Sequence, residues 1–86
     1  MSSAPIRVIV ADDHAVVREG IRSVLEQAQG FDVVAEASNG DEALAAVETH
    51  RPDVLVLDIT MPRRSGLDVV AALRASRHTT RVLILS

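Results

Sequence analysis

Cysteine, tryptophan and tyrosine are absent from this chain, and phenylalanine occurs once, at Phe31. The absence of cysteine excludes disulfide bonds, thiolate catalysis and cysteine-based zinc sites, and it fits a reducing compartment. The near absence of aromatic residues leaves a core of valine, leucine, isoleucine and alanine. Since hydrophobic residues still make up 48% of the 86 residues, we expect one small folded domain.

Long apolar runs and basic clusters are missing too. No run is long enough to cross a membrane, and the start, MSSAP, lacks the features of a secretory signal. The formal charge is −3, and Arg63 and Arg64 form the only adjacent basic pair. Because binding to nucleic-acid phosphates needs clustered basic residues, we expect no nucleic-acid surface here. The composition predicts a soluble, cytoplasmic protein without a membrane segment.

Short strands alternate with helices along the whole chain. The unbroken apolar run at residues 54–57 is typical of a strand that is buried on both faces of a parallel sheet, and strands are also expected at residues 6–11, 31–37 and 81–85. The helices between them would bury stripes formed by Val17, Ile21, Val24, Leu25 and Ala28, by Ala43, Leu44 and Val47, and by Leu67, Val70 and Leu73. Ser65 and Asp68 resemble a capping box that opens the third helix. This alternation predicts an α/β fold with right-handed crossovers.

The predicted sheet is incompletely covered. Three helices cannot cover both faces of four strands, and the apolar segment 82–85 would leave an edge that invites pairing with another chain. We therefore expect either a fragment of a longer protein, which we favour, or a homodimer or swapped assembly through the uncovered sheet.

Acidic residues follow two of the predicted strands. Asp12 and Asp13 come after residues 6–11, and Asp58 ends the run at 54–58. Ligand sites in parallel sheets gather beyond the carboxyl ends of strands, so these acids would converge if the two strands are neighbours. Three close carboxylates repel one another and need a cation. Oxygen ligands, with no histidine or cysteine expected nearby, favour Mg²⁺, or Mn²⁺ in its place, and a carboxylate beside the ion could attack phosphorus.

Each of these residues also has an ordinary interpretation. Asp12 or Asp13 could cap a helix, and Asp58 could be a simple strand-end acid. Their combination with the loop that follows Asp58 makes those interpretations the weaker ones. For His14 the ordinary interpretation, a solvated side chain in the first helical turn, is favoured, and Arg63-Arg64 is most often a solvated loop pair.

The segments VIVADDHAVVREG and VLVLDITMP, with the loop to Gly66-Leu67-Asp68, resemble the receiver domain of bacterial two-component response regulators. The start Asp-Asp-His is most similar to the subgroup with a helix-turn-helix DNA-binding output. The resemblance runs from about Ile6 to Ser86, so residues 1–86 would be one receiver domain that is incomplete at its C-terminal end. It implies a flavodoxin-like, doubly wound parallel sheet in the order 2-1-3-4, without the fifth strand and last helices.

The resemblance also assigns roles. Asp58 matches the phosphoacceptor; Asp12, Asp13, Asp58 and the main-chain carbonyl of Thr60 match the magnesium ligands. Ser86 matches the residue that contacts the phosphoryl group and helps the switch. Met61, Pro62 and Gly66 match the loop after the acceptor, and the family's lysine after a fifth strand has no counterpart.

The leading hypothesis is therefore a receiver that takes a phosphoryl group from a sensor histidine kinase and switches a DNA-binding output domain outside this chain. It would be phosphorylated stoichiometrically and would not be a turnover enzyme. The alternative is a Mg²⁺-dependent phosphatase or phosphotransferase with an aspartyl nucleophile. Such enzymes usually carry a second Asp two residues past the nucleophile, where this chain has Thr60.

Overall fold

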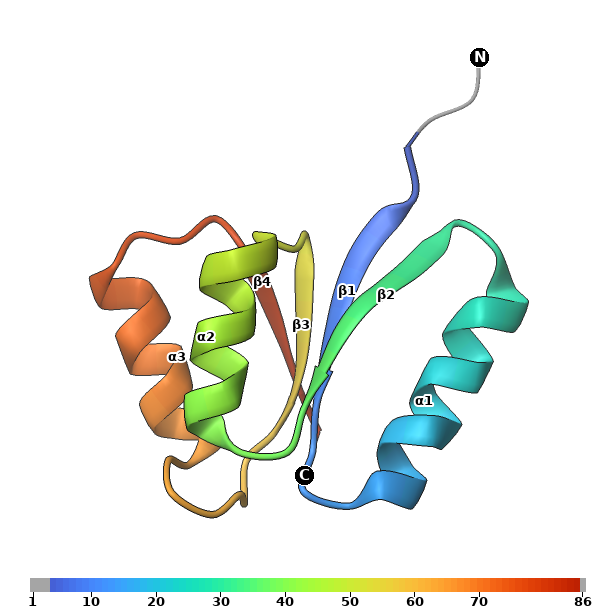
Figure 1. The fold of residues 1–86 in the computed structure, drawn as a ribbon. Helices are drawn as coiled ribbons and strands as arrows, with labels where there is room; N and C mark the ends of the chain where they lie inside the picture. The colour runs from blue at the N-terminus through green and yellow to red at the C-terminus, as the bar shows by residue number, and fades with distance from the viewer. Residues whose placement is uncertain (1–3, 86) are drawn as a thin grey trace.

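A computed structural model of the chain describes residues 4–85, which form one sheet with helices on both faces (Figure 1). The strands are β1 (Ile6–Ala11), β2 (Phe31–Ala37), β3 (Val54–Asp58) and β4 (Arg81–Leu85). The helices are α1 (Ala15–Ala28), α2 (Gly40–His50) and α3 (Gly66–Ala75). The predicted alternation of strands and helices is confirmed, with β3 one residue longer than the apolar run itself.

The four strands are parallel and lie in the order β2-β1-β3-β4, as predicted. Near its carboxyl end β1 pairs on both sides, with Ala11 opposite Ala37 of β2 and opposite Leu57 of β3. The β1–β2 register shifts once: Val8 pairs with Val33, but Ile9 pairs with Ala35, so Val34 has no partner in β1. The loops that follow β1, β2 and β3 all lie at the lower end of the sheet in Figure 1.

The core has two unequal parts, one on each face of the sheet. Helices α2 and α3 cover one face, and α1 covers the other (Figure 1). The core between the sheet and helices α2 and α3 consists of Ile9, Ala11, Ala37, Ala43, Val47, Leu55, Leu57, Met61, Val69 and Leu73. Under α1 the buried residues of the described chain are Val8, Val10 and Val56, with Ile21 and Leu25 packed against them. The face beneath α2 and α3 therefore supplies most of the hydrophobic stabilisation.

Helix α1 is more exposed than its apolar stripe predicts. Ile21 and Leu25 do face the sheet, but Val17 is 42% exposed and Val24 is 66% exposed. The prediction that these two valines are buried is wrong. Within residues 4–85, α1 is the only helix on its face, so one side of its stripe has nothing to pack against.

Helix α3 buries part of the predicted stripe: Leu73 is buried and Val70 packs against the core, as predicted, but Leu67 does not. Leu67 is 61% exposed, whereas Val69 is fully buried and Leu73 is 5% exposed. Ser65 precedes the helix, and its hydroxyl accepts a hydrogen bond from the Asp68 N–H at 3.3 Å, which is one half of the predicted capping box. This start places Gly66, Val69 and Leu73 on the buried side and turns Leu67 outward.

Strand β4 forms an outer edge of the described sheet. Leu83 is 56% exposed and Ile84 is 38% exposed, in agreement with the incomplete cover that the sequence predicts. Among residues 4–85, no helix combines the length and the apolar character that a membrane span requires.

Candidate functional site

The carboxyl ends of β1 and β3 bring two acids to the same level of the sheet. Because Ala11 pairs with Leu57, the next residues along these neighbouring strands are Asp12 and Asp58. Asp13 follows in the loop to α1. The strand order thus places the three predicted acids at one rim, beyond the carboxyl ends of the strands, where parallel sheets form their ligand sites.

The structure brings Asp12, Asp13 and Asp58 together, and it adds His14. One ligand atom from each of the four residues lies within 4.8 Å of all the others. Asp12 is only 5% exposed, Asp58 is partly buried, and Asp13 and His14 are open to solvent. The cluster is therefore a shallow acidic site with one buried carboxylate at its base.

Asp12 is the most firmly held of the acids. Its main-chain N–H donates to the Ala37 carbonyl of β2 at 3.0 Å, and one carboxylate oxygen accepts from the His14 N–H at 2.8 Å. Its own carbonyl accepts from the Arg18 guanidinium at 2.6 Å. These contacts fix a buried charge in one orientation, as a buried carboxylate requires.

His14 contacts both acids of the β1–α1 loop. Its Nδ1 atom lies 3.1 Å from an Asp12 carboxylate oxygen and 3.0 Å from one of Asp13, while its side chain stays 70% exposed. The hydrogen bond to Asp12, and then the charge of Asp13, raise the pKa of His14 above its ordinary value. The exposure agrees with the solvated histidine expected from the sequence, but the expectation that no histidine lies near the acids is wrong. The spacing of the sequence alone gives no signal for this contact.

Main chain of the loop between β3 and α3 lies against Asp58. The Thr60 N–H donates to Asp58 Oδ1 at 3.3 Å, and the Gly66 N–H donates to the Ile59 carbonyl at 2.7 Å. A Cβ atom on Gly66 would lie 2.5 Å from the Asp58 carbonyl oxygen, closer than real Cβ contacts. Glycine is therefore required where the loop returns past the end of β3.

The rest of the loop is held by packing and by one ion pair. Met61 is 7% exposed and belongs to the core beneath α2 and α3, whereas Pro62 is exposed. Arg64 donates from Nε to Asp41 of α2 at 2.9 Å. Arg64 is exposed, as the sequence predicts for a loop residue, and it also forms an ion pair with α2.

Ser86 and Arg18 are the remaining residues to place relative to the site. Ser86 lies outside the described residues. Arg18 contacts the site although the sequence pattern places it, with Glu19, Arg22 and Glu26, on the exposed side of α1. A signal for Arg18 is its place one helical turn after His14, within reach of the loop that carries the acids.

The donor set suits a hard divalent cation. Three carboxylates gather here, and a bound cation would offset the repulsion between their charges. Carboxylate oxygens are ligands of Mg²⁺, which keeps several waters and binds through few protein groups, as an open rim allows. The imidazole of His14 contacts the carboxylates of Asp12 and Asp13, so a nitrogen atom that could bind a metal lies beside these oxygen ligands.

Comparison with known proteins agrees with this architecture. Residues 8–86 match the response regulator receiver domain family. The chain is 44% identical over 82 residues to the oxygen regulatory protein NreC of Staphylococcus epidermidis, covering 94% of this chain and 38% of NreC. It is 46% identical over 83 residues to protein-glutamate methylesterase/protein-glutamine glutaminase 5 of Myxococcus xanthus, covering 96% of this chain and 24% of that protein.

The solved structures give the same result. The signal receiver domain of NarL from Mycobacterium tuberculosis superposes with a TM-score of 0.93 at 41% identity, covering 95% of this chain and 66% of that one. The chain spans well under half the length of the two curated relatives above. Since the family match covers nearly the whole sequence, the chain belongs to the response regulator receiver domain family.

Proposed function

We propose that residues 1–86 act as the phosphoacceptor domain of a two-component response regulator and that Asp58 receives the phosphoryl group from a sensor histidine kinase. The observation that carries this proposal is the convergence of Asp12, Asp13 and Asp58 at the carboxyl ends of adjacent parallel strands. Family membership supports it, because the receiver match includes all three positions.

In this proposal Asp12, Asp13, Asp58 and the main-chain carbonyl of Thr60 hold Mg²⁺, or Mn²⁺ in its place. Asp13 binds the ion directly and Asp12 binds it through water. When bound, the ion supplies positive charge that neutralises the transferring phosphoryl group. Asp12 needs no movement for this role, since its main chain and carboxylate are already held.

Asp58 supplies the nucleophile. The Thr60 N–H holds Oδ1, which leaves the other carboxylate oxygen free to form the bond to phosphorus. The phosphorus–nitrogen bond to the donor histidine breaks in the same transfer, and the donor imidazole keeps the bonding electrons. We propose that Met61, Pro62 and Gly66 hold the loop beside the acceptor and that Ser86 contacts the phosphoryl group and helps to switch the surface.

The output is proposed from the relatives. NreC is named an oxygen regulatory protein, and another relative from Mycobacterium tuberculosis, 43% identical over 81 residues, is named a probable transcriptional regulatory protein. We therefore assign this chain to phosphorelay control of transcription in the cytoplasm, with DNA bound by an output domain and not by residues 1–86. It would be labelled once per chain and lose the phosphoryl group slowly, without turnover of a substrate.

A direct test is phosphorylation by acetyl phosphate with Mg²⁺, followed by intact-mass measurement. We expect one added phosphoryl group on the wild type and none on Asp58→Ala. Asp32→Asn, an exposed acid at the opposite end of β2, is the matched control and should be labelled normally. Removal of Mg²⁺ with a chelator should abolish labelling. Labelling that survives Asp58→Ala would overturn the proposal.

A turnover assay separates this function from the alternative enzyme. With a chromogenic phosphate ester, a phosphatase with an aspartyl nucleophile would release product many times per chain. A receiver would release at most about one equivalent. The presence of Thr60, where such enzymes usually carry a second Asp, favours the receiver.

A further inference from the structure

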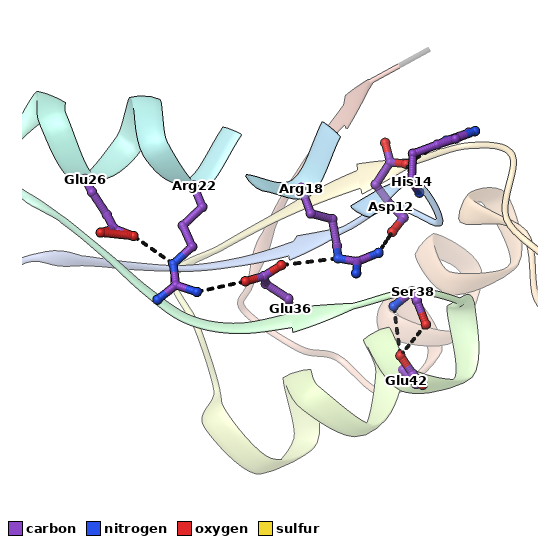
Figure 2. Close-up of polar contacts among 8 residues, drawn as sticks. All are labelled: Asp12, His14, Arg18, Arg22, Glu26, Glu36, Ser38 and Glu42. Atoms are coloured by element: carbon purple, nitrogen blue, oxygen red, sulfur yellow. Dashed lines mark hydrogen bonds and ion pairs between the residues drawn. The ribbon is translucent and has the colours of Figure 1, made fainter. Parts of the chain in front are cut away.

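Arg18 links helix α1 to the base of the acidic site. Its Nη1 atom donates to the Asp12 carbonyl at 2.6 Å, and its Nε atom donates to Glu36 of β2 at 3.2 Å (Figure 2). The Arg18 side chain is only 19% exposed, so it is not one of the solvated charges of this helix. One planar guanidinium thus serves two acceptors, one in the β1–α1 loop and one in β2.

The orientation of the Asp12 carbonyl affects the path of the loop that follows it. Its oxygen shares a rigid peptide plane with the N–H of Asp13, so any group that orients this carbonyl also sets where the main chain of Asp13 begins. The other side of Asp12 is tied to Ala37 of β2 through its own N–H. Arg18 therefore fixes the one peptide that joins the two acids of the β1–α1 loop.

Glu36 binds both Arg18 and the neighbouring arginine of α1, Arg22. One Glu36 carboxylate oxygen accepts from Arg18, and the other accepts from Arg22 Nη1 at 3.0 Å (Figure 2). Arg22 also bonds Glu26 at 2.7 Å and is 51% exposed, and within residues 4–85 it forms no hydrogen bond with Asp12. Arg18 and Arg22 thus share a helix, a charge and a partner, and only Arg18 reaches the site.

We propose that Arg18, oriented by Glu36, is a positioning residue that sets the divalent-cation affinity of the site through the Asp12–Asp13 peptide. This inference rests on the proposed function, since it takes Asp12 and Asp13 as metal ligands. Groups that orient metal ligands from outside the coordination sphere typically change affinity by about 10–100-fold when they are removed. Because Arg18 acts on main chain and not on a ligand atom, its effect belongs at the lower end of that range.

The test is Mg²⁺ affinity of the intact protein, measured by calorimetry or amide NMR titration at a temperature where every variant is folded. We expect Arg18→Gln to weaken binding about tenfold and Arg22→Gln, the matched control, to leave it within about twofold. Equal affinities for the two variants would overturn the inference. Asp13→Asn separates the two proposals: if it leaves Mg²⁺ binding unchanged, the proposed function fails, and this inference fails with it.

A lysine variant tests geometry against charge. Arg18→Lys keeps the positive charge but replaces the planar fork with a compact ammonium, so it should weaken Mg²⁺ binding nearly as much as Arg18→Gln. Full rescue by lysine would overturn a positioning role. Should Arg18→Gln fail to fold, Glu36→Gln takes its place, because it keeps the arginine and removes the group that orients it; unchanged affinity there would count against the inference.

A spectroscopic measurement reports on the same coupling without a substitution at Arg18. If the guanidinium sets the geometry of the site, then Mg²⁺ must in turn alter the guanidinium, because coupling between two positions is reciprocal. We expect Mg²⁺ to shift the Nε–H resonance of Arg18 and not that of Arg22, and we expect Asp13→Asn to remove the shift. An Arg18 resonance that is indifferent to saturating Mg²⁺ would contradict the inference.

Discussion

Glu42 shows how one side chain closes the loop between β2 and α2. Its carboxylate accepts hydrogen bonds from both the N–H and the hydroxyl of Ser38, each at 2.8 Å (Figure 2). The Glu42 N–H in turn donates to the Asn39 side chain, which caps the helix. The bond from the Ser38 N–H, and then that from its hydroxyl, lower the pKa of Glu42 below its ordinary value of 4.5. The charged form of Glu42 is therefore the one that the folded state favours.

This pKa gives stability a definite dependence on pH. The unfolded chain binds the Glu42 proton at higher pH than the folded chain does, so the stabilisation is present above about pH 4.5 and is lost as pH falls through the folded pKa. We expect Glu42→Gln to lower the Tm near neutral pH and the difference from wild type to shrink in acid, as followed by circular dichroism. Glu19→Gln, a substitution at an exposed acid of α1, is the control. A Tm difference independent of pH would contradict this assignment.

At the residue scale, the acids were predictable and their neighbours were not. Asp12, Asp13 and Asp58 follow strands, and the strand order alone brings them to one rim. The contacts of His14 and Arg18 depend on the path of a short loop and on side-chain rotamers. The hydrophobic pattern of the sequence does not encode those contacts, and it places both residues in solvent.

At the scale of elements, the loop after Asp58 packs closely against the chain at two glycines, Gly40 and Gly66. A Cβ atom on Gly40, at the start of α2, would overlap the carbonyl oxygen and side chain of Arg64, and one on Gly66 would press on the end of β3. The exposed ion pair between Arg64 and Asp41 also joins this loop to α2. The loop is thus packed against α2 and is not a free surface segment.

We expect Gly40→Ala and Gly66→Ala each to lower the free energy of unfolding by about 1–3 kcal/mol, because the added methyl group has no room. Gly66→Ala should also slow labelling of Asp58. Gly20→Ala in α1 is the control: nothing lies within 4 Å of its Cβ, so alanine should stabilise the helix by about 0.5–1 kcal/mol. Urea unfolding measures all three, and a neutral effect of Gly40→Ala would show that the loop does not lie against α2.

Element boundaries were predictable to within a residue for the strands, whereas helix burial was predicted less well. Apolar runs bounded by turn residues define strands directly, as Val54–Asp58 illustrates. A helical stripe indicates which side is apolar but not how much partner surface is present, which is why Val24 is exposed. Val69 and Val70 both pack on the core, so the buried side of α3 is wider than the single predicted stripe.

At the scale of the whole molecule, the uncovered β4 edge governs association. Leu83 and Ile84 are partly exposed on a strand that has no partner on its outer side among residues 4–85. We expect the 86-residue chain to self-associate as its concentration rises, and we expect Leu83→Lys to shift it toward monomer, because charge at an edge opposes strand pairing. Leu67→Lys, equally exposed on α3 but away from β4, is the control. Sedimentation velocity tests this, and a concentration-independent monomer would refute it.

The single register shift between β1 and β2 affects every residue of β2 that follows it. Side chains alternate between the two faces of a strand, and one unmatched residue reverses that alternation from there on. Val33 packs beneath α1, Val34 and Ala35 both pack on the opposite side, and Glu36 consequently points back toward α1. Shortening β2 by one residue would turn this carboxylate away from Arg18. The number of residues in β2, an edge strand of the described sheet, thus determines which helix its carboxylate can join to the acidic rim.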